Sequence, residues 1–171
     1  MVFREAEIVK SLNHKNIVKI KNCYTLCNMQ VVFIMEFLEG GELLDKVEKA
    51  TKFSEQQARI YFKQIVEAMN YCHKNNLIHR DLKLENVLLT NLNTDQIKIV
   101  DFGIAGVASK FNVENIDSGS LRYMSPEVVS SKAKQLTSAI DIWAMGVILF
   151  VMLVGDFPFN AVTNLGIMDK I

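Results

Sequence analysis

The spacing of apolar residues predicts a helix at the start of the chain and a pair of strands after it. Over roughly residues 2–12, apolar residues separated by charged ones have the period of an amphipathic helix. Two strand-length runs rich in β-branched residues follow, residues 17–20 and 31–38, with the polar region around Asn28 between them. This pattern predicts a hairpin, and the glycine pair after Glu39 marks the change to another element.

A long helix and two short strands are predicted in the middle of the chain. Ser54, with Gln57 three residues later, has the pattern of a capping box, and apolar residues then recur at helical spacing to about Asn75. The apolar runs 87–90 and 97–100 flank a polar turn and are typical of strands. Helix and strands therefore come first and the rest is mostly helix, with no sequence repeat or interdomain linker.

One apolar run, residues 142–154, could be mistaken for a membrane span. Asp141 and Gly155 bound it, and it falls short of the roughly 20 apolar residues that a spanning helix needs. A helix that is apolar on every side but too short for a bilayer is buried at the centre of a domain. We therefore predict a buried central helix and no membrane span.

Composition and charge narrow the classes of function. The chain has 171 residues, of which 50% are hydrophobic and 22% charged, as in one ordinary globular domain. Its 19 basic and 19 acidic residues give a net charge of zero, so it offers no broad cationic surface to nucleic acid or anionic lipid. We expect no nucleic-acid partner.

The cysteines and the N-terminus bear on cellular location. Three cysteines are too few, and odd in number, for a disulfide framework, which favours reduced thiols inside the cell. Cys23 and Cys27 lie four residues apart, but no second Cys or His pair follows at zinc-ligand spacing, so idle thiols are favoured over a metal site. The first ten residues lack an apolar signal core. The expected location is the cytoplasm, with the nucleus also open.

Residues suited to phosphoryl transfer gather around the two short strands. Asp81, Lys83 and Asn86 lie just before the first strand, and Asp101 follows the second. Because the two strands pair, both carboxylates should face one cleft. Phosphoryl transfer from a nucleotide needs carboxylate and amide oxygens for Mg²⁺, a lysine for the phosphate and an acceptor for the hydroxyl proton. The spacing therefore predicts nucleotide-dependent phosphoryl transfer.

Four motifs in chain order resemble those of the eukaryotic protein kinases. They are His79-Arg80-Asp81, Asn86, Asp101-Phe102-Gly103 and Ser125-Pro126-Glu127, the last where the family usually has Ala-Pro-Glu. Further likenesses are Glu5, similar to the ion-pairing glutamate of the family's C-helix, residues 35–43, similar to its hinge, and residues 141–146, similar to the start of its central helix. The resemblance thus covers the whole chain.

The resemblance implies an α+β fold, a partial two-lobed protein-kinase fold. Residues 1–38 would be a remnant of the N-lobe, with the C-helix, two strands and the hinge, and residues 39–171 a partial, mainly helical C-lobe. In the family, a Gly-rich loop and a strand lysine precede the C-helix, and further helices follow the central one. We therefore expect a fragment that is inactive on its own, with Glu5 lacking its lysine.

Catalytic roles follow from the resemblance residue by residue. Asp81 would be the catalytic base or orienting carboxylate for the substrate hydroxyl, and Lys83 would steady the transferred phosphate. Asn86 and Asp101 would hold two Mg²⁺ ions. Ser120, where the family usually has Thr, would bond both Asp81 and Lys83.

The resemblance also implies an ATP site and an internal spine. The residues at the ATP site would be Met35 as gatekeeper, Glu36 and Leu38 through their backbone groups at adenine, Glu42 near the ribose, Leu88 and Leu43 under the purine, and Lys83, Glu85, Asn86 and Asp101. The spine would comprise Val9, Ile20, His79, Phe102 and Asp141, with a structural role.

The substrate and the subgroup follow from finer features of the resemblance. Lys83, two residues after Asp81, is the serine/threonine pattern of the family, so the expected partner is a protein substrate with a Ser or Thr acceptor. Residues 40–47 and 85–103 look most like calcium/calmodulin-dependent and plant-type calcium-dependent kinases.

The segment of residues 102–126, where many kinases carry a phosphorylated Thr, contains no Thr. Glu114 or Asp117 could replace the phosphate by pairing with Arg80, or both could be solvated loop charges.

Two other functions stay open. An inactive pseudokinase or regulatory binding module is favoured by the missing lysine and opposed by the intact Asp81, Asn86 and Asp101. In that case a regulatory partner could cover the apolar surface of the C-lobe. A small-molecule kinase of related fold is disfavoured by residues 118–127, which in the family shape a groove for a polypeptide.

Overall fold

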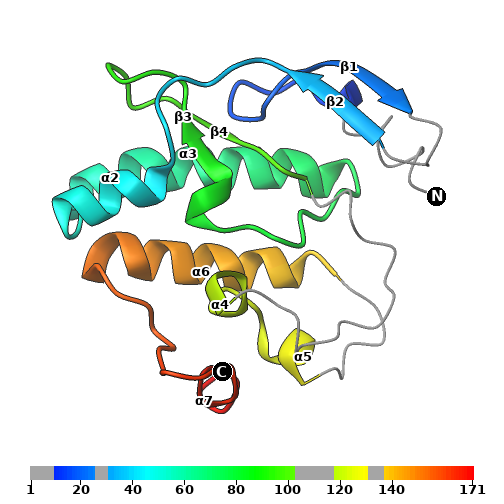
Figure 1. The fold of residues 1–171 in the computed structure, drawn as a ribbon. Helices are drawn as coiled ribbons and strands as arrows, with labels where there is room; N and C mark the ends of the chain where they lie inside the picture. Colours follow the sequence, from blue (N-terminus) through cyan, green and yellow to red (C-terminus); the bar gives the residue numbers. More distant parts are fainter. Residues whose placement is uncertain (1–9, 26–30, 103–117, 131–136) are drawn as a thin grey trace.

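The computed structural model describes residues 10–25, 31–102, 118–130 and 137–171 of the chain (Figure 1). In this part of the chain, two small antiparallel sheets are joined to a helical body. Strand β1 (Ile20–Thr25) pairs with β2 (Val31–Met35), and β3 (Val87–Leu89) pairs with β4 (Ile97–Ile99). The β1–β2 hairpin lies at one end, above the helices (Figure 1). The arrangement is α+β, as predicted.

The prediction of the first strand at residues 17–20 is wrong: the strand of the hairpin lies at Ile20–Thr25. Strand β1 only begins at Ile20, because the preceding residues bond β4 instead. The Val18 amide donates to the Ile99 carbonyl at 3.0 Å, and the Ile99 amide donates to the Asn16 carbonyl at 2.9 Å. Apolar residues alone do not reveal which neighbour a strand pairs with. Strand β2 also ends early, at Met35 rather than at residue 38.

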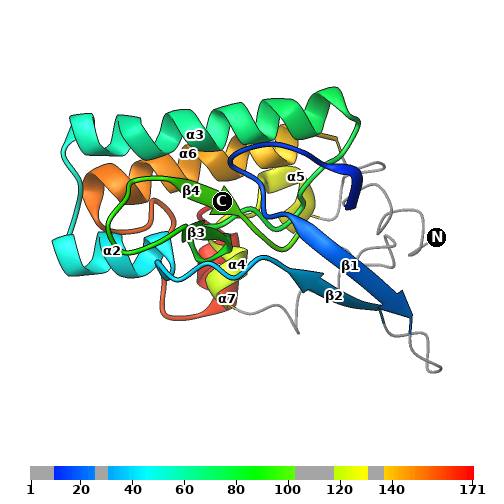
Figure 2. The ribbon, with the colours of Figure 1, turned by 90° about the horizontal axis from the view of Figure 1, so that it is seen from above.

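Two long helices, α3 (Glu55–Lys74) and α6 (Ala139–Val154), form the centre of the molecule. They lie side by side in both views (Figures 1 and 2). Helix α3 begins as predicted, since the Ser54 hydroxyl accepts from the Gln57 amide at 3.3 Å. It ends at Lys74 with Asn75 as its C-cap, which confirms the predicted end. Buried residues of both helices belong to the main hydrophobic core.

Helix α2 (Leu43–Ala50) is not predicted by the sequence pattern. Gly40 lets the chain pass close to β3 before this helix, because a Cβ at that position would meet the Leu89 side chain and lie 2.6 Å from its carbonyl oxygen. Lys46 of α2 donates to the Tyr61 hydroxyl at 2.6 Å and to Asp95 Oδ1 at 3.0 Å. These bonds tie α2 to α3 and to the segment before β4.

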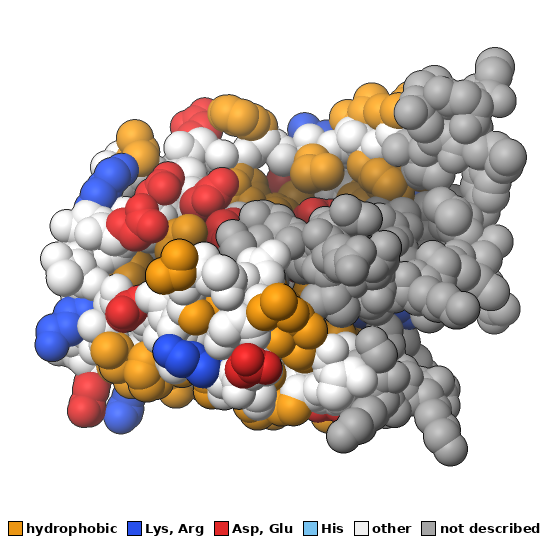
Figure 3. All heavy atoms as spheres, turned by 60° about the horizontal axis from the view of Figure 1, so that its bottom comes forward, with side chains coloured by type: hydrophobic (Ala, Val, Ile, Leu, Met, Phe, Trp, Pro, Cys, Tyr) orange, Lys and Arg blue, Asp and Glu red, His pale blue; other side chains and the backbone are white. Residues whose placement is uncertain are grey.

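Short helical segments complete the helical body. They are the 3₁₀ turn η1 (Leu84–Asn86) and the helices α4 (Ser118–Leu121), α5 (Pro126–Val129) and α7 (Asn164–Met168). Leu121, Val129 and Ile167, from the last three, form a second small hydrophobic cluster. A view of this side shows hydrophobic side chains at the surface among charged ones (Figure 3).

Helix α6 is buried on one face, as expected of a central helix, and its other face is exposed, as expected of the apolar surface of a partial C-lobe. Ile148 and Met152 have no exposed surface, whereas Ile142 is 55% exposed and Phe150 40% exposed. The composition of the helix is apolar all round, but α3 covers only one side of it in the described structure. Among the described helices, none is long and apolar enough to cross a membrane.

Candidate active site

Three of the four predicted catalytic residues, Asp81, Lys83 and Asn86, lie between α3 and β3, and the fourth, Ser120 of α4, contacts Lys83. Asn86, at the end of η1, donates from Nδ2 to the Asp81 carbonyl at 2.7 Å and to Asp81 Oδ2 at 3.3 Å. Lys83 Nζ lies 3.0 Å from Asp81 Oδ2 and donates to Ser120 Oγ at 2.8 Å. The Asp81 side chain stays 38% exposed, so its carboxylate is accessible from solvent. A carboxylate, a cation and a hydroxyl therefore face one another at an open surface.

The pairing of β3 with β4 brings Asp101 to the same end of the small sheet as Asn86. Val87 pairs with Ile99, and the Val100 amide donates to the Asn86 carbonyl at 2.9 Å. Asp101 is exposed and has a φ of +56°, a left-handed conformation that non-glycine residues rarely adopt. Arg80 has a φ of +73°. Such conformations gather at functional sites, where surrounding contacts hold them in place.

Asp141 of α6 bonds the loop of residues 75–83 between α3 and η1, which carries two of the predicted catalytic residues and is here called the catalytic loop. Asp141 is 1% exposed; its Oδ2 accepts from the His79 amide at 2.9 Å, and its Oδ1 accepts from the Arg80 amide at 3.0 Å. His73 Nε2 lies 2.8 Å from Oδ2. His73 was not among the predicted site residues; it lies in the last turn of α3, where a histidine also suits the helix dipole, so its position alone gave no signal.

The described members of the predicted spine are all buried, namely Ile20, His79, Phe102 and Asp141. The His79 and Phe102 rings lie 4.8 Å apart, and His79 Nε2 is 3.0 Å from the Val100 carbonyl. Val9 lies outside the described residues, as do Glu5, Gly103, Glu114 and Asp117. The described contacts link the loop before β3 to the end of β4.

The comparison with known protein families shows to which family this chain belongs. The sequence model of the protein kinase domain matches residues 1–171. The chain belongs to the protein kinase family. The human NUAK family SNF1-like kinase 1 is 40% identical over 168 residues, which cover 98% of this chain and 25% of that protein. Serine/threonine-protein kinase SAPK3 of Oryza sativa subsp. japonica is 42% identical over 160 residues, which cover 93% of this chain and 47% of that protein.

A solved structure agrees with the fold of this kinase domain. The crystal structure of Rad53 1-466 in complex with AMP-PNP is similar to this structure, with a TM-score of 0.81 and 32% sequence identity. The matched region covers 99% of this chain and 42% of the Rad53 chain. The recognition of a eukaryotic serine/threonine protein kinase domain and of its partial two-lobed fold is thus confirmed. The chain spans between a quarter and a half of these relatives. Their names do not mention calcium, so the resemblance to calcium-dependent kinases stays a prediction.

The predicted nucleotide residues of the kinase domain begin at the end of β2. Met35, the last residue of that strand, is 44% exposed. The Glu36 carboxylate accepts from Lys98 Nζ at 2.5 Å and from the Lys19 amide at 2.7 Å. Partial burial opposes these bonds, but they outweigh it and lower the pKa of Glu36 below its ordinary value. Glu36 Oε1 is thus bonded to Lys98 of β4, and the Glu36 amide donates to the Lys19 carbonyl at 3.1 Å, which leaves the Glu36 carbonyl as the backbone group for a ligand.

The remaining predicted nucleotide residues lie where α2 approaches β3. Glu42 forms an isolated β-bridge with Leu88, and burial together with the charges of Asp45 and Glu85 raises its pKa. Glu85 Oε2 is buried, with no hydrogen-bond partner in the described part of the chain. Leu88 is half-buried, and so is Leu38, which lies three residues after the end of β2. Leu43 has no exposed surface and belongs to the core.

The burial of His79 predicts a loss of stability at acid pH. Burial lowers the pKa of His79 below 6.5, and this outweighs the opposite effect of the Asp141 charge. As the pH falls below 6.5, the unfolded chain therefore binds a proton at this site that the folded protein does not, and the free energy of unfolding decreases. Urea unfolding between pH 5 and about 7.5 measures this slope.

His79→Gln is the control for that experiment, because glutamine does not titrate. The variant should show a smaller loss of stability between pH 6.5 and 5. A residual slope is expected from His14, whose pKa is also lowered, by burial and by Lys15. An unchanged slope in His79→Gln would show that this histidine does not titrate as its burial implies.

Proposed function

We propose that the full-length gene product is a protein kinase that transfers the γ-phosphate of ATP to Ser or Thr hydroxyls of proteins. The observation that carries the proposal is the contact of Lys83 with both Asp81 and Ser120, beside Asn86. The AMP-PNP in the Rad53 structure supports an adenine nucleotide as donor. We further propose that residues 1–38 belong to the N-lobe and hinge and residues 39–171 to the C-lobe.

Each group of the site has a distinct role in this proposal. Asp81 would orient the substrate hydroxyl and accept its proton, since its carboxylate is accessible. Lys83 would compensate the charge of the transferred phosphate, and Ser120 would hold the lysine in place. A location in the cytoplasm, or in the nucleus, stays a prediction from the sequence.

The donor set also fits Mg²⁺. Asn86 uses its amide nitrogen for Asp81, which leaves the amide oxygen for a cation. Asp101 offers an exposed carboxylate at the same end of the sheet. Oxygen ligands of this kind suit Mg²⁺, which when bound would neutralise the phosphate charges. Asn86 and Asp101 are therefore the proposed metal ligands.

Asp81→Asn in the full-length gene product tests the role of Asp81. We expect kcat for a Ser peptide to fall by about 10²–10⁴-fold, the usual contribution of a positioned acid or base. The affinity for ATP should change little, because Asp81 meets the hydroxyl and not the nucleotide. Steady-state kinetics and ATP titration measure the two effects.

Asp169, the exposed residue that follows α7, provides the control, and Asp169→Asn should behave like the wild type. Unchanged phosphate transfer by Asp81→Asn would refute the proposed site. A large loss of ATP affinity would instead place Asp81 at the nucleotide.

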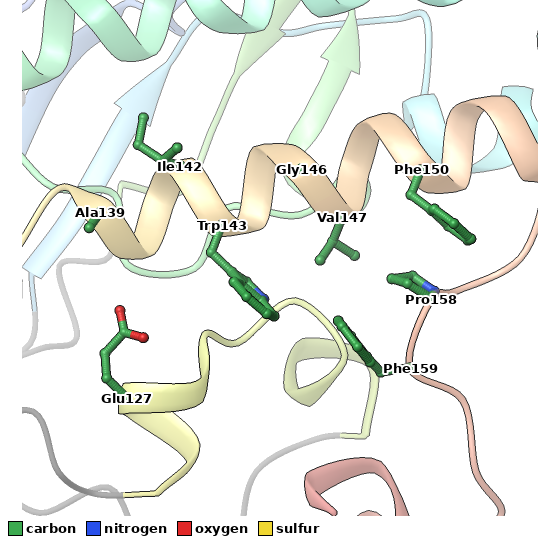
Figure 4. A pocket seen from close by; sticks show the side chains of 9 residues that line it. All are labelled: Glu127, Ala139, Ile142, Trp143, Gly146, Val147, Phe150, Pro158 and Phe159. Atoms are coloured by element: carbon green, nitrogen blue, oxygen red, sulfur yellow. The ribbon is translucent and has the colours of Figure 1, made fainter. Parts of the chain in front are cut away.

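A second candidate function, an inactive kinase-like binding module, is favoured by a groove along α6. Trp143, Val147 and Phe150 line it from α6, Glu127 from α5, and Phe159 from the segment that follows α6 (Figure 4). It has a volume of about 590 Å³ and mostly apolar walls, which suit a protein partner. Phosphate transfer by the wild-type protein would exclude the inactive alternative, and its absence would favour it.

A further inference from the structure

Two amide side chains, Asn16 and Gln64, bond the backbone at the start of β4. Asn16 Nδ2 donates to Gln64 Oε1 and to the Ile97 carbonyl, both at 2.8 Å. Gln64 Oε1 also accepts from the Ile97 amide at 3.1 Å, and its Nε2 donates to the Asp95 carbonyl at 2.8 Å. Three backbone groups at the entry to β4 are therefore held by one pair of side chains, from α3 and from the segment before β1.

The same segment continues along β4 toward the active site. The Ile99 amide donates to the Asn16 carbonyl, and Ile17 forms a parallel bridge with Ile99. On its other edge, β4 pairs with β3, so that Val100 reaches the Asn86 carbonyl. Asp101 follows two residues after the end of the strand. The position of Asp101 thus depends on the register of a strand of only three residues.

A strand this short needs help to keep its register. A two-stranded sheet is marginally stable, and a slip of one residue would turn every side chain of β4 to the other face. Asn16 is 1% exposed, so its amide bonds are formed away from water, where such bonds are strong and costly to lose. The amide pair fixes Ile97 at one end of β4, while the pairing with β3 fixes Val100 at the other.

We propose that Asn16 and Gln64 are positioning residues that set the metal-binding end of β4. They hold the register in which Val100 bonds Asn86 and Asp101 follows at the same end of the sheet, although neither side chain belongs to the catalytic group. Outer residues that orient a metal ligand commonly change metal affinity by about 10–100-fold. The inference rests on the proposed kinase function, since Asp101 acts there as a ligand of Mg²⁺.

Gln64→Leu in the full-length gene product tests the proposal with Mn²⁺ as the probe in the presence of ATP. We expect the dissociation constant for Mn²⁺, measured by electron paramagnetic resonance, to rise about tenfold. The KM for a Ser peptide should stay unchanged, because Ser120 and Asp81 are not displaced. A purely structural role would lower the melting temperature and the amount of active protein without changing the Mn²⁺ affinity of the folded fraction.

Asn16→Ala and the double variant show whether the pair acts as a unit. The double variant should shift the Mn²⁺ affinity by less than the sum of the two single shifts, because the Asn16–Gln64 bond is lost in each single variant. Gln56→Leu, on the exposed face of the same helix, is the matched control and should bind Mn²⁺ like the wild type. If Gln64→Leu does not fold, Gln64→Glu replaces it; it keeps the acceptor for Ile97 and loses donation to Asp95, and a smaller shift is expected.

An unchanged Mn²⁺ affinity in the Gln64 variant, or an equal shift in Gln56→Leu, would overturn the positioning role. Failure of the proposed function is seen separately, as absence of phosphate transfer by the wild-type protein. The Mn²⁺ measurement does not depend on transfer, so it decides the positioning role in either case.

Discussion

Asp101→Asn in the full-length gene product should lower phosphate transfer to a Ser peptide by at least about 10²-fold. The variant keeps the shape of the side chain but removes the negative charge that would hold Mg²⁺ against the phosphates. Charge stabilisation at the transferred group is the largest catalytic contribution in this chemistry. Asp101 is exposed and lies at the same end of the β3–β4 sheet as Asn86, the other proposed metal ligand. Steady-state transfer of labelled phosphate measures the effect.

The Mg²⁺ dependence of the residual activity makes the test specific. If Asp101 is a metal ligand, the remaining transfer in Asp101→Asn should require more Mg²⁺ for half-maximal rate. The melting temperature should stay near that of the wild type, because an exposed carboxylate contributes little to folding. Asp169→Asn again serves as the control. Transfer at the wild-type rate would contradict the assignment of Asp101.

The sequence motifs anticipated which residues of the proposed active site lie close together in one loop. Asp81, Lys83 and Asn86 lie within one loop, so their spacing alone placed them together, and the contacts at 2.7–3.3 Å confirm it. The contact of Lys83 with Ser120 joins residues 37 positions apart. Spacing carries no information about a contact of that range, and only the resemblance to kinases supplied it.

Other long-range contacts of polar side chains, those of Gln64 and His73, were not predicted. Gln64 has the spacing of a polar position on an amphipathic helix, yet it bonds the backbone of β4. His73 lies in the last turn of the same helix and bonds Asp141, 68 residues further along the chain. Hydrophobic periodicity identifies the buried face of a helix but not the partners of its polar residues. Such partners depend on the tertiary arrangement.

Element types were predicted better than pairing and exposure. The capping pattern gave the start of α3 and the apolar periodicity gave its end, because both are local signals. The β-branched residues at 17–20 were assigned to the hairpin, whereas Val18 bonds β4. The apolar run of α6 gave the helix and its length, but not that Ile142 and Phe150 would be the exposed residues. Composition gives the preference of a segment for burial, but the neighbours decide which face is covered.

Asp141→Ala should cost about 3–5 kcal/mol of the free energy of unfolding, as expected for removal of one partner from a buried polar cluster. The substitution leaves the His79 and Arg80 amides without their acceptor, and a buried unsatisfied donor costs about 1–3 kcal/mol. It also removes the partner of His73. Against a typical stability of about 5–15 kcal/mol, this loss is a large share. Urea unfolding at pH 7.5 measures it.

Two variants make the Asp141 result interpretable. Asp141→Asn keeps one oxygen as an acceptor for a backbone amide, so its loss of stability should lie between those of the wild type and Asp141→Ala. Asp169 is exposed and follows α7, so the free energy of unfolding of Asp169→Ala should stay within about 0.5 kcal/mol of the wild-type value. A loss below about 1 kcal/mol in Asp141→Ala would mean that other groups or water can satisfy the two amides. The catalytic loop would then not depend on α6 for its conformation, and its position would have to be set by the β3–β4 pairing alone.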